Sequence, residues 1–62
     1  MTVQDIITKY QIESFRIVVY LNEKIEVLYD SLESDCIPSN YLINSIVENV
    51  RLSFDQTLEI EI

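Results

Sequence analysis

Residues 15–21 read Phe-Arg-Ile-Val-Val-Tyr-Leu, and the fold prediction depends on this stretch. Its β-branched and aromatic residues suit the pleated surface of a strand better than a helix. A period of two gives an apolar inner face and an outer face formed by Arg16, Val18 and Tyr20. We therefore predict a strand over residues 15–21 that buries its inner face.

The spacing of apolar residues changes after this strand. Asn22 stands where a helix N-cap belongs. Apolar residues then recur at intervals of three and four, at Ile25, Leu28, Tyr29 and Leu32. This spacing is typical of the buried stripe of a helix, so we predict a helix over residues 23–34.

The only proline marks the next break in the chain. Pro38 ends a tight connection over residues 35–38, after which Ser39 or Asn40 is able to cap a second helix. A second apolar stripe follows, formed by Leu42, Ile43, Ile46, Val47 and Val50. We predict a helix over residues 40–52 and expect both stripes to lie in the core.

The two ends of the chain are less regular. Residues 1–14 form an N-terminal arm or a weak helix, for which Thr2 is a possible cap. Residues 55–62 form an acidic and apolar tail whose end alternates, so it is a short edge strand or a frayed end. The central unit then covers residues 15–54.

Two other arrangements of the first half remain open. In one, residues 15–21 and a second strand beginning at Lys24 form a hairpin that turns at Asn22 and Glu23. Two-residue hairpin turns favour glycine, which this chain lacks, so we prefer the helix. In the other, residues 3–34 form one long helix, which the β-branched run disfavours modestly.

The chain is too small to bury a large core. About 60 residues cover only about 60% of the surface that the unfolded form exposes. The single cysteine, Cys36, excludes an internal disulfide, and the absence of histidine argues against a structural zinc site. Oligomerisation is the remaining means of stabilisation, so we expect an obligate homodimer.

The composition also argues against catalysis. Without histidine or glycine, the chain has no imidazole base and no glycine-rich phosphate loop. We expect a non-enzyme with no catalytic residue, no cofactor and no metal. No apolar run approaches the ~20 residues that span a bilayer, and the N-terminus does not resemble a signal peptide. We therefore expect a cytoplasmic protein with no membrane partner.

Acidic residues dominate the chain but are unevenly distributed. The net charge of −7 argues by itself against binding to a phosphate backbone. Residues 1–24 are neutral overall, whereas residues 25–62 carry the whole negative excess. A surface that binds nucleic acid would therefore lie in the first third of the chain.

The order of strand, helix, tight turn and helix over residues 15–52 resembles the ribbon-helix-helix superfamily of the Arc and methionine repressors. The matching segments are RIVVYL, NEKIEVLYDSL, CIPS and NYLINSIVENV. The resemblance implies an α+β, mainly helical fold, an intertwined homodimer in which one strand from each chain forms an antiparallel ribbon. In this superfamily the ribbon enters the major groove of DNA.

The resemblance also suggests residues that contact DNA. Bases would be read by the outward strand positions, Arg16, Val18 and Tyr20. Ser39 and Asn40, at the start of the second helix, would offer backbone N–H groups to a phosphate. Lys24 lies beside the expected ribbon, and its charge would add a further phosphate contact.

These observations favour a small dimeric DNA-binding transcriptional regulator of the repressor type. Its partners would be a second copy of the chain and double-stranded DNA. Two other functions remain open. One is an acidic protein-interaction module, antitoxin-like or an anti-repressor, whose acidic helices meet a basic protein. The other is an acidic DNA mimic that inhibits a nucleic-acid enzyme.

Overall fold

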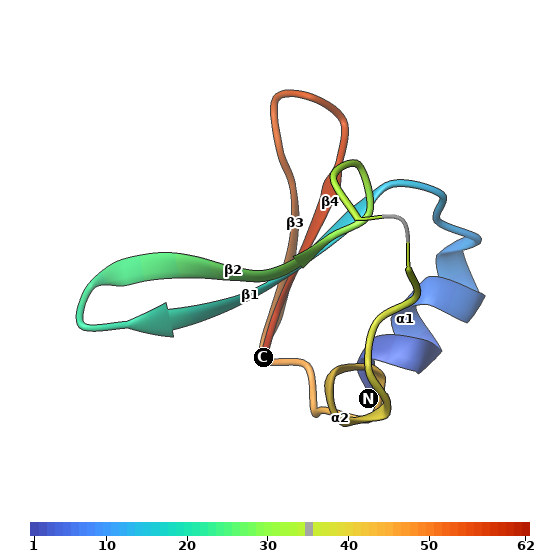
Figure 1. Cartoon of the computed structure of the whole chain (residues 1–62), viewed down its shortest axis with the longest axis horizontal. Coiled ribbons are helices and arrows are strands. Elements are labelled where there is room, and N and C mark those ends of the chain that lie inside the picture. The colour runs from blue at the N-terminus through green and yellow to red at the C-terminus, as the bar shows by residue number, and fades with distance from the viewer. Residues whose placement is uncertain (35) are drawn as a thin grey trace.

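Residues 1–34 and 36–62, which the computed structural model describes, form a four-stranded β-sheet and two short helices (Figure 1). Along the chain the elements are α1 (Val3–Tyr10), β1 (Phe15–Leu21), β2 (Lys24–Asp30), α2 (Asn40–Ile43), β3 (Asn49–Leu52) and β4 (Leu58–Glu61). The fold is therefore α+β with more strand than helix.

The strands are ordered β2-β1-β4-β3 across the sheet. β1 pairs antiparallel with β2 and parallel with β4, while β3 pairs antiparallel with β4. On one face of the sheet, Ile17 and Ile60 of the two central strands are fully buried against Val3 and Ile6 of α1. Leu42 of α2 packs against the same cluster. This face holds the core, and we call the opposite face the open face.

The N-terminal segment forms the weak helix that was one of its two expected structures. The Asp5 backbone N–H donates to the Thr2 hydroxyl (3.2 Å), and the Thr2 N–H donates to the Asp5 carboxylate (3.0 Å). This capping box satisfies two backbone donors that a helix start leaves free. Eight residues are short for an isolated helix, so the burial of Val3 and Ile6 stabilises it.

The strand over residues 15–21 is confirmed, but the helix predicted over residues 23–34 is wrong. The chain turns at Asn22 and Glu23 and returns as β2, which makes the hairpin that the sequence alone disfavours. Both turn residues have positive φ angles, 50° and 65°, as two-residue hairpin turns require. Asparagine tolerates this region better than most residues, so the turn forms without glycine.

A β-bulge explains the helix-like spacing in this segment. Ile17 of β1 pairs with Tyr29. The next residue, Val18, pairs with Val27, so Leu28 is an extra residue in β2. The bulge interrupts the alternation of the strand and leaves apolar residues three and four positions apart. Three residues of the stripe that we expected in the core are exposed: Ile25, Leu28 and Leu32.

The helix predicted over residues 40–52 is also wrong, because only its first turn forms. Ser39 caps α2, one of the two expected caps, but the helix ends at Ile43. Beyond it, Ile46 forms an isolated bridge with Thr2, and the chain then continues into β3. Pairing with Thr2 and with β4 replaces the hydrogen bonds of the predicted helix. Ile46 is exposed rather than buried in the core.

The C-terminal tail contains a central strand rather than an edge strand or a frayed end. β4 lies between β1 and β3, and its Ile60 is fully buried. Because β2 and β4 of the same chain flank residues 16–18 of β1, a strand from a second chain has no place beside them. This arrangement contradicts the mainly helical, intertwined ribbon-helix-helix dimer predicted for residues 15–52.

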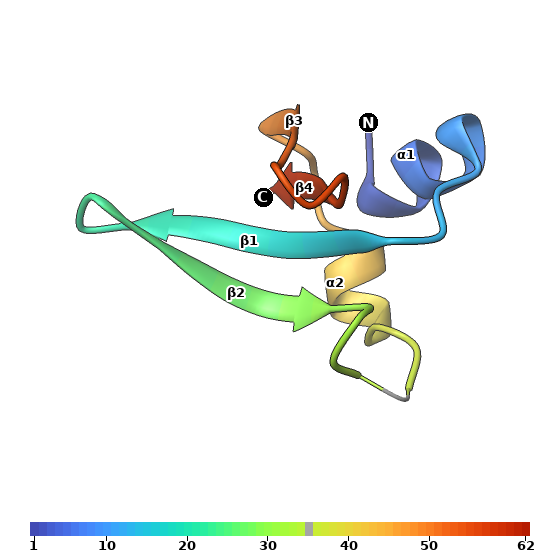
Figure 2. The same ribbon diagram turned by 90° about the horizontal axis from the view of Figure 1, so that it is seen from above.

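The β1–β2 hairpin extends beyond the rest of the molecule (Figures 1 and 2). β4 pairs with β1 only as far as Val18, so the outer half of the hairpin is a two-stranded ribbon. In both views its turn lies far from the two helices. The side chains of this outer half are consequently mostly exposed.

Candidate functional site

A row of alternating charges crosses the open face of the sheet. The strand register places Arg16 of β1 opposite both Asp30 of β2 and Glu59 of β4. Arg51 of β3 lies opposite the same Glu59. Each strand therefore contributes one residue to the row, and opposite charges directly across neighbouring strands stabilise a sheet.

Both arginines form ion pairs in this row. Arg16 Nε lies 2.9 Å from Asp30 Oδ2, and its Nη1 lies 3.5 Å from Glu59 Oε2. Arg51 Nε lies 3.2 Å from Glu59 Oε1, and its Nη2 lies 2.8 Å from Glu61 Oε1. These side chains are partly buried, so salt screens the pairs less than it would at a fully exposed surface.

The same network holds the turn between β3 and β4, residues 53–57. Asp55 forms an ion pair with Arg16 and accepts a hydrogen bond from the Ser53 hydroxyl. It also accepts a bond from the Thr57 N–H (3.1 Å), and the Ser53 N–H donates to the Thr57 carbonyl (3.0 Å). A charged group inside the turn thus ties its backbone to β1.

The network lowers the pKa of two of its carboxyl groups. The hydrogen bond from Ser53, followed by that from Arg16, holds the pKa of Asp55 well below its usual range. The backbone N–H of Leu32, followed by Arg16, lowers the pKa of Asp30. Both carboxylates therefore keep their charge into the acid range, and Arg16 keeps its partners.

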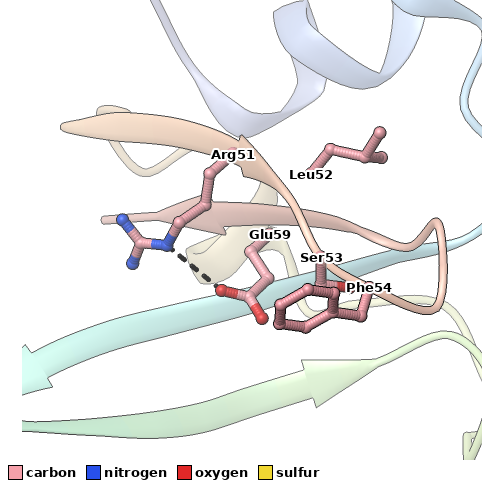
Figure 3. Close-up of a pocket in the computed structure, with 5 residues that line it drawn as sticks. All are labelled: Arg51, Leu52, Ser53, Phe54 and Glu59. Atoms are coloured by element: carbon pink, nitrogen blue, oxygen red, sulfur yellow. Dashed lines mark hydrogen bonds and ion pairs between the residues drawn. The ribbon is translucent and has the colours of Figure 1, made fainter.

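The hydrogen-bonded turn over residues 53–57 exposes a phenylalanine to solvent. Phe54 is fully exposed, although the residues on either side of it are hydrogen-bonded. A shallow pocket of about 320 Å³ lies at this position, lined by Arg51, Leu52, Ser53, Phe54 and Glu59. In Figure 3, Arg51 and Glu59 point toward each other and the Phe54 ring lies beside Ser53, while Leu52 points away from them.

The chemistry of this region suits recognition. Its carboxylates are paired with arginines, and the Ser53 hydroxyl is bonded to Asp55, so the pocket offers an apolar ring beside compensated charges. No three side chains that could ligate a metal converge within residues 1–34 and 36–62. In the same part of the chain, no helix is both long and apolar enough to cross a membrane.

The three residues predicted to read bases share the open face of β1 but differ in accessibility. Arg16 is held by three carboxylates, so its guanidinium donors are already engaged. Val18 is buried, whereas Tyr20 is exposed on the outer hairpin. Of the three, Tyr20 is the side chain that is accessible to a partner without breaking other contacts.

The residues predicted to contact phosphates do not come together. Lys24 is exposed at the hairpin turn, whereas Ser39 and Asn40 lie at the start of α2. In Figure 1, α2 lies well apart from that turn, at the bottom of the view. Asp35, part of the connection predicted over residues 35–38, lies outside the described residues.

The sequence predicts no role for Phe54 and Asp55, which lie at the expected boundary between the central unit and the tail. A signal was present, because Ser53 and Asp55 favour turns and separate residues 49–52 from the alternating residues 58–61. Taken together, these features indicate a hairpin. The ion pair with Arg16 had no comparable signal.

Comparisons with protein-family models, curated proteins and solved structures find no match to this chain. We therefore infer the function of the chain from its residues and their geometry. Two features need explanation: the exposed ring at the β3–β4 turn and the apolar hairpin that projects from the sheet.

Proposed function

We propose that this chain is a small acidic protein-interaction module that binds a basic protein through its β3–β4 turn, with Phe54 as the anchor. The observation that carries the proposal is the full exposure of Phe54 on a turn whose other residues are held by hydrogen bonds. Aromatic residues are enriched at the centres of protein interfaces, where a few side chains account for most of the binding energy.

The order of the turn supports this role. Binding costs free energy when a mobile loop must first become ordered. Asp55 orders the turn through Arg16, Ser53 and Thr57 before any partner arrives. Presenting Phe54 to an apolar pocket on the partner therefore needs little further ordering.

The charge around Phe54 favours one class of partner. On the open face, four carboxylates meet two guanidinium groups, and the whole chain carries a net charge of −7. A pocket rimmed by lysine or arginine would meet an attractive potential here. Duplex DNA would meet repulsion, and Arg16 is already engaged, so the geometry favours a protein partner over groove reading.

The test is to isolate the protein that co-purifies with the chain from its source and to measure their affinity by calorimetry. We expect Phe54→Ala to weaken the complex about 30-fold, because truncating an anchor costs on the order of 2 kcal/mol. Tyr41→Ala is the matched control, since it removes another highly exposed aromatic ring, on α2. The control should bind as the natural chain does.

Both variants should fold, because neither side chain is buried, and circular dichroism checks this. The affinity should also fall as salt screens the charge attraction. A Phe54→Ala variant that binds as tightly as the natural chain would overturn the proposal. Retardation of duplex DNA at low salt, with no protein partner recovered, would support the transcriptional regulator instead.

A further inference from the structure

The outer half of the β1–β2 hairpin carries an apolar surface on the open face of the sheet. Tyr20 pairs with Ile25 and Val18 pairs with Val27, and cross-strand partners share a face. Val18 is buried, whereas Tyr20 is 55%, Ile25 47% and Val27 54% exposed. We call these three exposed residues the hairpin surface.

The bulge in β2 creates this surface. Tyr29 lies on the core side of the sheet, where its ring stacks on Phe15 with 5.5 Å between centroids. Strict alternation would place Val27 and Ile25 on that same side. Because Leu28 is an extra residue, both side chains move to the open face, where the described helices do not cover them.

The monomer exposes more surface than a folded chain of its mass is expected to expose. A protein of 7.3 kDa should expose about 4,200 Å², whereas this chain exposes 4560 Å². Among the described residues, the buried apolar side chains are Val3, Ile6, Phe15, Ile17, Val18 and Ile60. So small a core is marginal, and the single cysteine is free. Covering the hairpin surface would add the burial that the monomer lacks.

The small core indicates that a second copy of the chain covers the hairpin surface, and the charges indicate where the two copies meet. The hairpin surface is uncharged, whereas elsewhere on the open face four carboxylates share two arginines: Asp30, Asp55, Glu59 and Glu61. Two chains of net charge −7 repel each other, so two copies meet most favourably at the hairpin surface, where carboxylates are absent. A two-fold axis at the hairpin surface packs the β1–β2 hairpin of one chain against the same hairpin of the second chain.

Packing of the open faces is favoured over pairing of the β2 edges. The bulge at Leu28 interrupts the outer edge of β2, and charged Lys24 and Glu26 occupy its regular part. Bulges and charged residues are devices by which proteins prevent edge-to-edge pairing. The copy therefore contacts side chains of the hairpin rather than its backbone.

We propose that the hairpin surface is a self-association site, where the open faces of two β1–β2 hairpins pack against each other around a two-fold axis. The proposal is independent of the partner proposed for Phe54, because Phe54 lies on the β3–β4 hairpin. The contact is small, so the dissociation constant lies in the micromolar range. Because the contact is apolar and the copies carry like charge, the dimer tightens as salt is added.

Sedimentation equilibrium of the full chain at low and high salt tests this site. Val27→Glu places a charge on the hairpin surface and should weaken the dimer about tenfold or more. Leu21→Glu is the matched control, because it adds the same charge to the same hairpin. Leu21 is similarly exposed (51%) but lies on the opposite face of β1 from Tyr20. The control should change the dissociation constant by less than about threefold.

Circular dichroism establishes that the variants fold. If Val27→Glu does not fold, Val27→Thr replaces it, since threonine keeps the shape and strand preference of valine while weakening the apolar contact. A chain that stays monomeric at about 1 mM in high salt overturns the proposal. Equal weakening by Val27→Glu and Leu21→Glu also overturns it, because the contact would then not lie on the open face.

Discussion

The two hairpins of this molecule are built in opposite ways. In β1–β2, strands of seven residues are joined by a two-residue turn at Asn22 and Glu23, and the outer half projects with apolar side chains uncovered. In β3–β4, strands of four residues are joined by a turn that Asp55 ties to Arg16. This short hairpin exposes an aromatic ring, Phe54, in an otherwise hydrogen-bonded turn (Figure 3).

The difference separates two sources of stability. The short hairpin is completed within the monomer, by ion pairs to β1 and by the burial of Ile60. The outer half of the long hairpin has only its own backbone pairing, and a two-stranded ribbon is marginally stable by itself. The long hairpin should therefore open locally before the short one, unless a second molecule covers it.

The largest effect should come from the core beneath the short hairpin. Ile60 of β4 is fully buried, so Ile60→Ala should lower the free energy of unfolding by about 2–5 kcal/mol through the cavity it leaves. Ile25→Ala, on the outer hairpin, should cost less than about 1 kcal/mol at concentrations where the chain is monomeric. Denaturant unfolding measures both changes. Equal losses would contradict the distinction between the two hairpins.

Acid should weaken the charge network of the short hairpin. The pKa of Asp55 is lowered by Ser53 and then by Arg16, and that of Asp30 by the Leu32 N–H and then by Arg16. The unfolded chain then binds protons at higher pH than the folded chain. The stabilisation is complete above about pH 5 and is lost as the pH falls below about 4.

Arg16→Met should reduce this acid dependence, because it removes the cation that both carboxylates share. The variant should also be less stable than the natural chain at pH 7. Thermal unfolding of both proteins from about pH 2 to 7 provides the comparison. An acid dependence that is unchanged in Arg16→Met would show that Arg16 does not stabilise the two carboxylates.

The smallest effect should come from the turn of the long hairpin. Glu23 has a φ of 65°, where its Cβ costs energy that glycine avoids. Glu23→Gly should therefore stabilise the hairpin by about 0.5–1 kcal/mol and slow amide exchange in its outer half. Glu26→Gly, within β2, should have the opposite sign because glycine weakens a strand. Faster exchange in Glu23→Gly would mean that the turn is not strained.

The local parts of the fold could be predicted from the sequence. The β-branched run of residues 15–21 forms a strand, and Thr2 and Ser39 cap helices. Each of these features depends on neighbours within about four positions. The candidate site could be predicted only in part. Ser53 and Asp55 indicate a turn at residues 53–57, but nothing in the sequence indicates the role of Phe54.

The longer-range parts could not be predicted in the same way. The bulge at Leu28 gave β2 the apolar spacing of a helix, and the apolar stripe over residues 40–52 did not reveal that its second half pairs with β4. The contact between Arg16 and Asp55 joins residues 39 positions apart. Local patterns hold no information about which distant residue becomes a neighbour.

The sequence by itself determined an acidic chain with a small core, no internal disulfide and one strong strand, because these follow from composition and short-range geometry. Only the tertiary structure decided that β2 and β4 flank this strand and that Arg16 is held by carboxylates rather than left free. The physical reason is that a strand is stabilised by its cross-strand neighbours. Those neighbours are chosen by contacts between distant residues, whose free energy no local pattern contains.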